Sequence, residues 1–158
     1  MITGGYIDLT GMPTEGATHA AIKAAIEAGL KHWHARILRR HFEPGASSRY
    51  GYKKRTRRYD ATKLRRFGHT TPLVYSGAMR HELLMRTPRI TGTHRAMTMR
   101  LRARALRFSA QAAYKNYPDM RAEVRAMTPD EEAEIVGVIE KSLAAALNSL
   151  PTRQRLVA

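Results

Sequence analysis

The side chains with the clearest chemical capability in this sequence are basic and aromatic residues that alternate within one segment. Residues 36–66 hold twelve Lys or Arg residues and two acidic ones, so this short segment carries +10 of the formal net charge of +15. Guanidinium and ammonium groups bind phosphates and carboxylates, and tyrosine rings stack on bases or pack in protein interfaces. The candidate interface residues are Arg49, Tyr50, Tyr52, Lys53, Lys54, Arg55, Arg57, Arg58, Tyr59, Lys63, Arg65 and Arg66.

Three interpretations of this basic segment differ in the partner that it meets. Arginine and tyrosine are favoured in protein interfaces, so the segment can dock onto an acidic protein surface. The same groups can contact phosphates and stack on bases, which makes nucleic-acid binding through residues 49–66 the alternative. A third interpretation is a solvated loop without a partner. The sequence has no helix-turn-helix, zinc-finger or RNP-type pattern that would favour nucleic acid.

The other polar residues form no pattern typical of catalysis or metal binding. Seven histidines are scattered along the chain, and His32 and His34 are two positions apart in an expected helix, so they do not face each other. The sequence has no Gly-rich phosphate loop, no G-x-S-x-G motif and no cysteine. Asp130, Glu131 and Glu132 are better explained by helix capping. We therefore expect no enzymatic activity, no metal site and no cofactor.

Length and composition indicate one domain. A chain of 158 residues with 43% hydrophobic residues can bury a modest core. The first residues lack the basic and apolar regions of a signal peptide, and no apolar run approaches the roughly 20 residues that span a bilayer. We expect a protein of a cytoplasm-like compartment with no membrane partner. It would comprise an N-terminal arm (1–13), one domain (14–150) and a flexible tail (151–158).

Two long helices frame the predicted domain. Apolar residues recur at helical spacing over residues 14–42, and Thr14 is suited to cap this helix. A second helix is predicted over residues 128–150, because Thr128 and Glu131 form a capping box and apolar residues follow at the same spacing. The core of the domain should therefore be built largely on these two helices.

The sequence between the helices begins as an extended basic loop, at about residues 43–70, and then becomes an apolar clasp. Pro72 restricts the backbone of the residue before it, and Gly77 can adopt a positive φ in the turn after the apolar residues. We expect the clasp to fasten the basic loop onto the core. The clasp residues are Pro72, Leu73, Val74, Ser76, Gly77 and Arg80.

A β-hairpin is predicted over residues 82–107, with its turn at residues 91–93. Apolar and polar residues alternate cleanly in its second strand, which indicates one buried and one exposed face. Arg100, Arg102 and Arg104 fall on the exposed face and form a basic ridge. The ridge is either a partner-binding face or a solvated face of the sheet.

The predicted fold class is α+β. The first hairpin strand is expected near residues 82–90, the second over 95–105, and a third strand over 119–126, where apolar and charged residues alternate again. The expected architecture is a long N-terminal helix, a small antiparallel sheet of three to four strands and a C-terminal helix packed on the sheet.

Two short motifs, in a fixed order, carry a resemblance to a known family. They are Pro72-Leu73-Val74-Tyr75-Ser76-Gly77-Ala78-Met79-Arg80 and Ala126-Met127-Thr128-Pro129-Asp130-Glu131. With the order of elements around them, they resemble the bacteriophage neck and tail-completion family, also called the virion-morphogenesis family, over roughly residues 17–147. The chain departs from the family pattern at residues 114–118, which lack the His and Gly of many relatives, so this connection should be built differently.

The resemblance implies a structural virion protein at the head–tail junction of a tailed bacteriophage, as a neck, tail-completion or tail-terminator subunit. It implies a six-fold or twelve-fold ring around the channel through which genomic DNA passes, contacted non-specifically. The implied partners are further copies of the chain and the adjacent portal-side connector and tail proteins. The helix at 14–42 would pack against a neighbouring subunit, and the basic loop would dock on an adjacent ring. The implied location is the virion, and the host cytoplasm during assembly.

Overall fold

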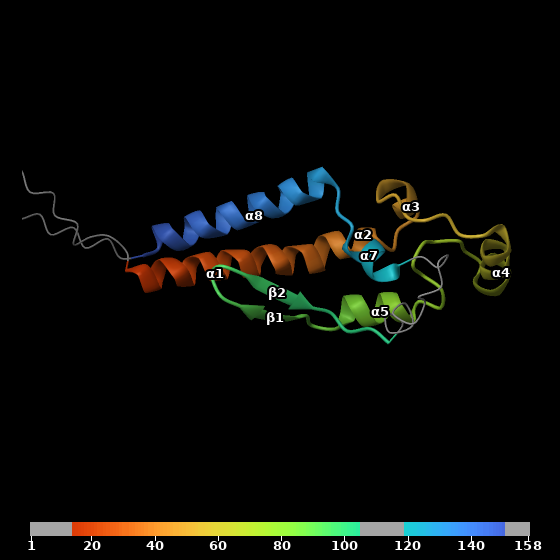
Figure 1. Ribbon diagram of the computed structural model, residues 1–158, viewed down its shortest axis with the longest axis horizontal. Coiled ribbons are helices and arrows are strands. Elements are labelled where there is room, and N and C mark those ends of the chain that lie inside the picture. The colour runs from red at the N-terminus through yellow and green to blue at the C-terminus, as the bar shows by residue number, and fades with distance from the viewer. Residues whose placement is uncertain (1–13, 105–118, 151–158) are drawn as a thin grey trace, which may run out of the picture.

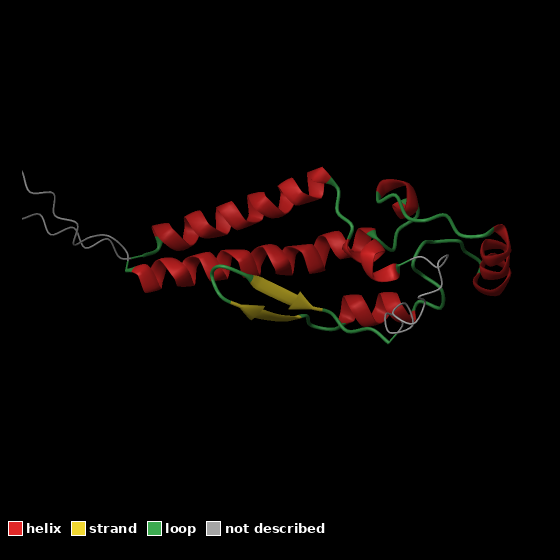
Figure 2. Ribbon diagram, in the orientation of Figure 1, coloured by secondary structure: helices red, strands yellow, loops and turns green. Residues whose placement is uncertain are grey.

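The computed structural model describes residues 14–104 and 119–150 of the chain. The predicted arm (1–13), the connection at 105–118 and the tail (151–158) lie outside the described residues. The fold is α+β, as predicted (Figure 2). The elements are α1 (Glu15–His32), the π-helical turn η1 (Trp33–Ile37), α2 (Leu38–Arg40), α3 (Ala46–Arg49), α4 (Arg57–Phe67), α5 (Ala78–Met85), β1 (Arg89–Gly92), β2 (Met97–Arg100), α7 (Met120–Arg125) and α8 (Pro129–Asn148).

α1, η1 and α2 form one continuous helix, which confirms the predicted long N-terminal helix (Figure 1). Thr14 caps it, since its Oγ1 accepts a hydrogen bond from the backbone N–H of Ala17 at 3.2 Å. In the π-helical turn, the N–H of Leu38 donates to the carbonyl of Trp33, five residues earlier. A π turn shifts the helical phase, and Trp33, Ile37 and Leu38 are all buried in the core.

α8 runs antiparallel to α1 and packs along it (Figure 1). Ala21, Ala25 and Gly29 are buried at four-residue spacing on one face of α1. A Cβ added at Gly29 would lie 2.6 Å from Cγ1 of Ile139, so the two helices approach closely there. The capping box predicted at the start of α8 is confirmed. We expected this helix to pack on the sheet; its main partner is α1, because strands of four residues are too short to cover a helix of 20.

β1 and β2 form the predicted antiparallel hairpin. Its turn lies at residues 93–96 rather than 91–93, and the N–H of Thr93 donates to the carbonyl of Ala96 at 2.9 Å. Burial alternates from residue 97 to residue 104 as predicted, although β2 ends at Arg100. The register pairs Arg89 with Arg100, Ile90 with Met99, Thr91 with Thr98 and Gly92 with Met97.

Two segments predicted as strands are wholly or partly helical. The strand expected near residues 82–90 begins inside α5, and the third strand expected over 119–126 is α7. The described residues therefore contain a two-stranded sheet instead of three to four strands. Asp119 explains α7, because its carboxylate accepts from the N–H groups of Arg121 and Ala122 at 2.9 and 3.2 Å and so caps a helix. Over a segment this short, apolar alternation does not separate strand from helix.

The hydrophobic core surrounds the C-terminal half of the first long helix. Its buried residues are Trp33, Ile37, Leu38, Phe42, Ala46, Tyr52, Leu73, Val74, Met79, Leu83, Ala103 and Val124. Leu73 and Val74 belong to the clasp, so the clasp does join the core. Leu73 adopts a φ of 56°, a strained value for a residue with a branched side chain. Closer to the start of α1, Ile22 and Ile26 are only half-buried.

Candidate docking interface

Most of the basic segment is helical, so the prediction of an extended loop at about residues 43–70 is wrong. Thr56 caps α4 by accepting from the N–H of Tyr59 at 3.2 Å. Gly68 ends the helix in the left-handed conformation, with a φ of 72°. These two local signals stabilise a helix despite its density of positive charge. α4 lies at the opposite end of the molecule from the start of α1 (Figure 1).

α4 presents arginines to solvent on one side and contacts residues 71 and 75 on the other. Its exposed arginines, called the α4 arginines below, are Arg57, Arg58, Arg65 and Arg66. On the inner side, Lys63 is buried and its Nζ donates to the carbonyl of Thr71. Burial lowers the pKa of Lys63. The rings of Phe67 and Tyr75 meet edge to face, with centroids 4.7 Å apart. The inner face thus holds α4 in place while the α4 arginines stay in solvent.

An ion pair joins the residues before α4 to α7. Nη1 and Nη2 of Arg55 donate to Oε1 and Oε2 of Glu123 at 2.9 and 2.6 Å. The two side chains are 20% and 8% exposed, so salt screens the pair much less than it would a surface pair. Nη1 of Arg55 also donates to the carbonyl of Lys53 at 2.8 Å. This pair fixes the path of the chain immediately before α4.

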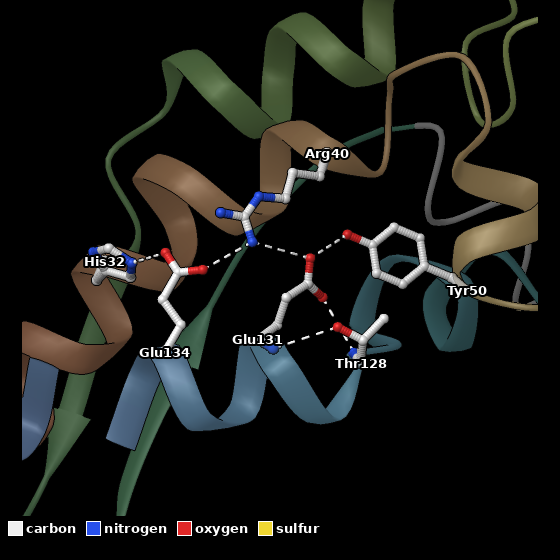
Figure 3. Close-up of polar contacts among 6 residues, drawn as sticks. All are labelled: His32, Arg40, Tyr50, Thr128, Glu131 and Glu134. Atoms are coloured by element: carbon white, nitrogen blue, oxygen red, sulfur yellow. Dashed lines mark hydrogen bonds and ion pairs between the residues drawn. The ribbon is translucent and has the colours of Figure 1, made fainter. Parts of the chain in front are cut away.

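A cluster of polar contacts joins the start of α8 to the first long helix and to the chain after α3 (Figure 3). Oε1 of Glu131 accepts from the O–H of Tyr50 at 2.7 Å and from Nη1 of Arg40 at 3.3 Å. Nη1 of Arg40 also donates to Oε2 of Glu134 at 2.9 Å, and Oε1 of Glu134 lies 2.7 Å from Nε2 of His32. Burial raises the pKa of Glu131, but the hydrogen bonds from Tyr50, a backbone N–H and Arg40 outweigh it, so its pKa lies below the ordinary value.

His41 is fully buried beside this cluster. Its Nδ1 shares a hydrogen bond with the O–H of Tyr52, and its ring stacks on Tyr50 with centroids 4.0 Å apart. Burial lowers the pKa of His41 to about 4, so the ring is neutral near pH 7, and its tautomer decides whether Nδ1 or the O–H of Tyr52 donates. Its Nε2 has no hydrogen-bond partner in the described part of the chain. Tyr52 is therefore buried in the core, and the half-buried Tyr50 is engaged within the protein by Glu131 and His41.

The structure divides the predicted interface residues into two groups. Tyr50, Tyr52, Arg55 and Lys63 are buried or paired within the protein and act as anchors. The residues that remain exposed are Arg49, Lys53, Lys54, Arg57, Arg58, Tyr59, Arg65 and Arg66. The basic surface is thus smaller than predicted and is centred on α4.

The structure also shows which residues of the clasp and of the basic ridge are exposed. Pro72 is half-buried, Ser76 and Arg80 are exposed, and Gly77 precedes α5 with a φ of 81°. Arg100, Arg102 and Arg104 are exposed on the alternating segment that leaves the hairpin. The clasp is therefore chiefly structural, whereas the ridge remains available to a partner.

The sequence pattern does not reveal the acidic and histidine side chains that hold the site together. It predicts a strand at Glu123 and only a capping role for Glu131. Glu131 is 81 positions from Tyr50 and 91 positions from Arg40, the two residues that donate hydrogen bonds to its carboxylate. No local pattern signals contacts over such separations.

The exposed arginines of this site can donate hydrogen bonds to phosphates or carboxylates. Among residues 14–104 and 119–150, no three His, Asp or Glu side chains are arranged to hold a metal ion. None of the helices in these ranges combines the length and apolarity needed to cross a bilayer. No family model, no curated protein and no solved structure matches this chain. A function must therefore be argued from the residues of this chain alone.

Proposed function

We propose that this chain is a structural protein of a tailed bacteriophage, a ring-forming head–tail connector subunit of the neck, tail-completion or tail-terminator type. The two motifs at residues 72–80 and 126–131 support this proposal through their resemblance to that family. The observation that carries it is the position of the α4 arginines, which stand in solvent at one end of the molecule. A basic helix held in this way suits docking onto an acidic face of an adjacent ring.

The proposed mechanism is docking without catalysis. The α4 arginines meet carboxylates on a portal-side connector or tail protein, and the ion pair between Arg55 and Glu123 keeps them oriented. Ile22 and Ile26 on α1 are half-buried in the single chain, which suits a helix that is further covered by a neighbouring subunit. Genomic DNA passes through the ring and is contacted only non-specifically.

The mass of the particle in solution tests this proposal. Light scattering at moderate and at low salt should detect a closed hexamer or dodecamer, or a monomer that forms such rings once portal-side or tail proteins are added. Electron microscopy of the same sample should show rings. A strict monomer that forms no ring with these proteins would contradict the connector function.

Nucleic-acid binding is the second candidate, because the α4 arginines could contact phosphates equally well. Under this alternative, the logarithm of the affinity for duplex DNA falls steeply with the logarithm of salt concentration, and the variant R58Q/R65Q reduces that slope by about 2. The matched control is K23Q/K141Q, which removes the same charge from exposed lysines on α1 and α8. The connector proposal predicts weak DNA binding with equal effects of the two variants.

A further inference from the structure

An apolar groove of about 1260 Å³ lies between the first long helix, the end of the hairpin, α7 and the start of α8. Its lining includes Leu30, Met99, Leu101 and Met127. Met127 is 41% exposed, and the other three are half-buried. The described elements of the chain therefore leave this apolar surface partly uncovered.

Arginines surround the groove. None of the described residues that line it is acidic. Arg86 contacts Glu82 only at 3.9 Å, and an apolar floor ringed by cations favours a partner that presents carboxylates beside apolar side chains. A nucleic acid would satisfy the cations but would bring no aliphatic groups to the floor. The arginines are Arg86, Arg100, Arg102, Arg104, Arg121 and Arg125.

A surface of the required kind is present on the same chain, on the side of α8 that faces solvent. This α8 outer stripe consists of Glu132, Val136, Glu140, Leu143 and Leu147, spaced as one helical face. Val136 and Leu147 are 51% and 38% exposed, so both present aliphatic surface to solvent. Glu132 and Glu140 are exposed too, and neither carboxylate has an ion-pair partner in the described part of the chain.

We propose that the α8 outer stripe of one copy docks into the arginine-ringed groove of a second copy. Val136 and Leu147 would cover the floor, and Glu132 and Glu140 would pair with arginines of the rim, Arg100 and Arg102 among them. α8 cannot fill the groove of its own molecule, because Ile139 packs against Gly29 and Glu134 is bonded to Arg40.

The two surfaces are different faces of one molecule. Ile135 lines the groove, whereas Val136 belongs to the outer stripe, and successive helical positions point about 100° apart. The contact is therefore heterologous, so each copy offers one groove and one stripe, and repetition gives a ring or an open filament. This interface deepens the connector proposal and rests on it for the expectation that the assembly closes into a ring.

Complementary charge reversals test the interface. E132R/E140R and R100E/R102E should each weaken self-association by about 100-fold or more, since each places like charges opposite one another. An equimolar mixture should associate again, because the groove of each variant then faces a stripe of opposite charge. Sedimentation velocity measures all three samples, and the control R36E/R39E, at two exposed arginines of the first long helix, should associate like the unmodified chain. Far-UV circular dichroism and urea midpoints establish that the variants are folded.

The outcomes separate this interface from the proposed function. Rings that persist in both reversal variants overturn the interface and leave the connector proposal standing. If each reversal variant alone fails to associate, the mixture associates again, and the chain joins no portal-side or tail protein, the interface is supported and the connector proposal is contradicted. A strictly monomeric chain overturns the interface. So does a chain that does not self-associate and whose R100E/R102E variant loses binding to duplex DNA.

Discussion

Arg55 and Glu123 are 68 residues apart in the sequence and meet side on, with donor–acceptor distances of 2.9 and 2.6 Å. A planar guanidinium is suited to this two-point contact with a carboxylate, which fixes orientation as well as distance. Since α4 follows Arg55 almost directly and Glu123 belongs to α7, the pair determines where the α4 arginines stand relative to the core. The basic surface of the protein thus depends on one buried acidic residue.

R55M should destabilise the protein much more than R57M does. Removing Arg55 leaves the carboxylate of Glu123, which is 8% exposed, without its partner, and we expect a loss of about 2–3 kcal/mol. Arg57 is exposed, so R57M should change the free energy of unfolding by less than about 0.5 kcal/mol. Urea unfolding followed by the fluorescence of Trp33 measures both. Equal effects would show that the ion pair contributes nothing.

G29A and G137A should change stability in opposite directions, although both replace a helical glycine by alanine. Alanine favours a helix over glycine by about 0.8–1 kcal/mol, and nothing lies within 4 Å of a Cβ added at Gly137, so G137A should stabilise by roughly that amount. At Gly29 the Cβ would lie 2.6 Å from Cγ1 of Ile139, and overpacking should outweigh the helix preference and destabilise by about 1 kcal/mol. Thermal melts at equal chain concentration decide the signs. Stabilisation by G29A would contradict the close contact of α1 with α8.

Stability should fall as the pH drops from 6.5 to 5, and His41 should be a main cause. An unfolded histidine titrates near pH 6.5, whereas burial lowers the pKa of His41 to about 4 in the folded state. Between these values the unfolded chain binds the proton and the folded chain does not, so stability decreases by at most about 1.4 kcal/mol per pH unit. H41Q lacks this titration, and its urea midpoint should depend less on pH in this window. An unchanged pH dependence in H41Q would refute the assignment.

Y50F should cost more stability than Y59F. The O–H of Tyr50 donates to Glu131, a carboxylate that is 3% exposed, and its removal should destabilise by about 1–2 kcal/mol. Tyr59 is 39% exposed, so loss of its O–H should be close to neutral. Differential scanning calorimetry on the two variants makes the comparison. A neutral Y50F would mean that Glu131 is held by its other contacts alone.

The elements that were correctly predicted have their signals within a few residues. Thr14 and Thr128 cap the two long helices, as expected, because a cap needs only the side chain and an N–H three residues on. The alternation that exposes Arg100 and Arg102 was also visible in the sequence. By contrast, the alternation over 119–126 was misleading, since Asp119 caps the six-residue helix α7 there and so short a segment does not reveal a period.

Local signals in the sequence are enough to predict the two long helices, the hairpin and the concentration of positive charge in residues 36–66. Which basic side chains remain in solvent depends on long-range packing. Arg55, Lys63 and Arg58 are all basic residues of the same segment, so the sequence does not distinguish them. The fold pairs Arg55 with Glu123 and buries Lys63 against Thr71. Caps and periodicity act between neighbouring residues, whereas a buried charge needs a partner that the folded chain can bring from any distance in the sequence.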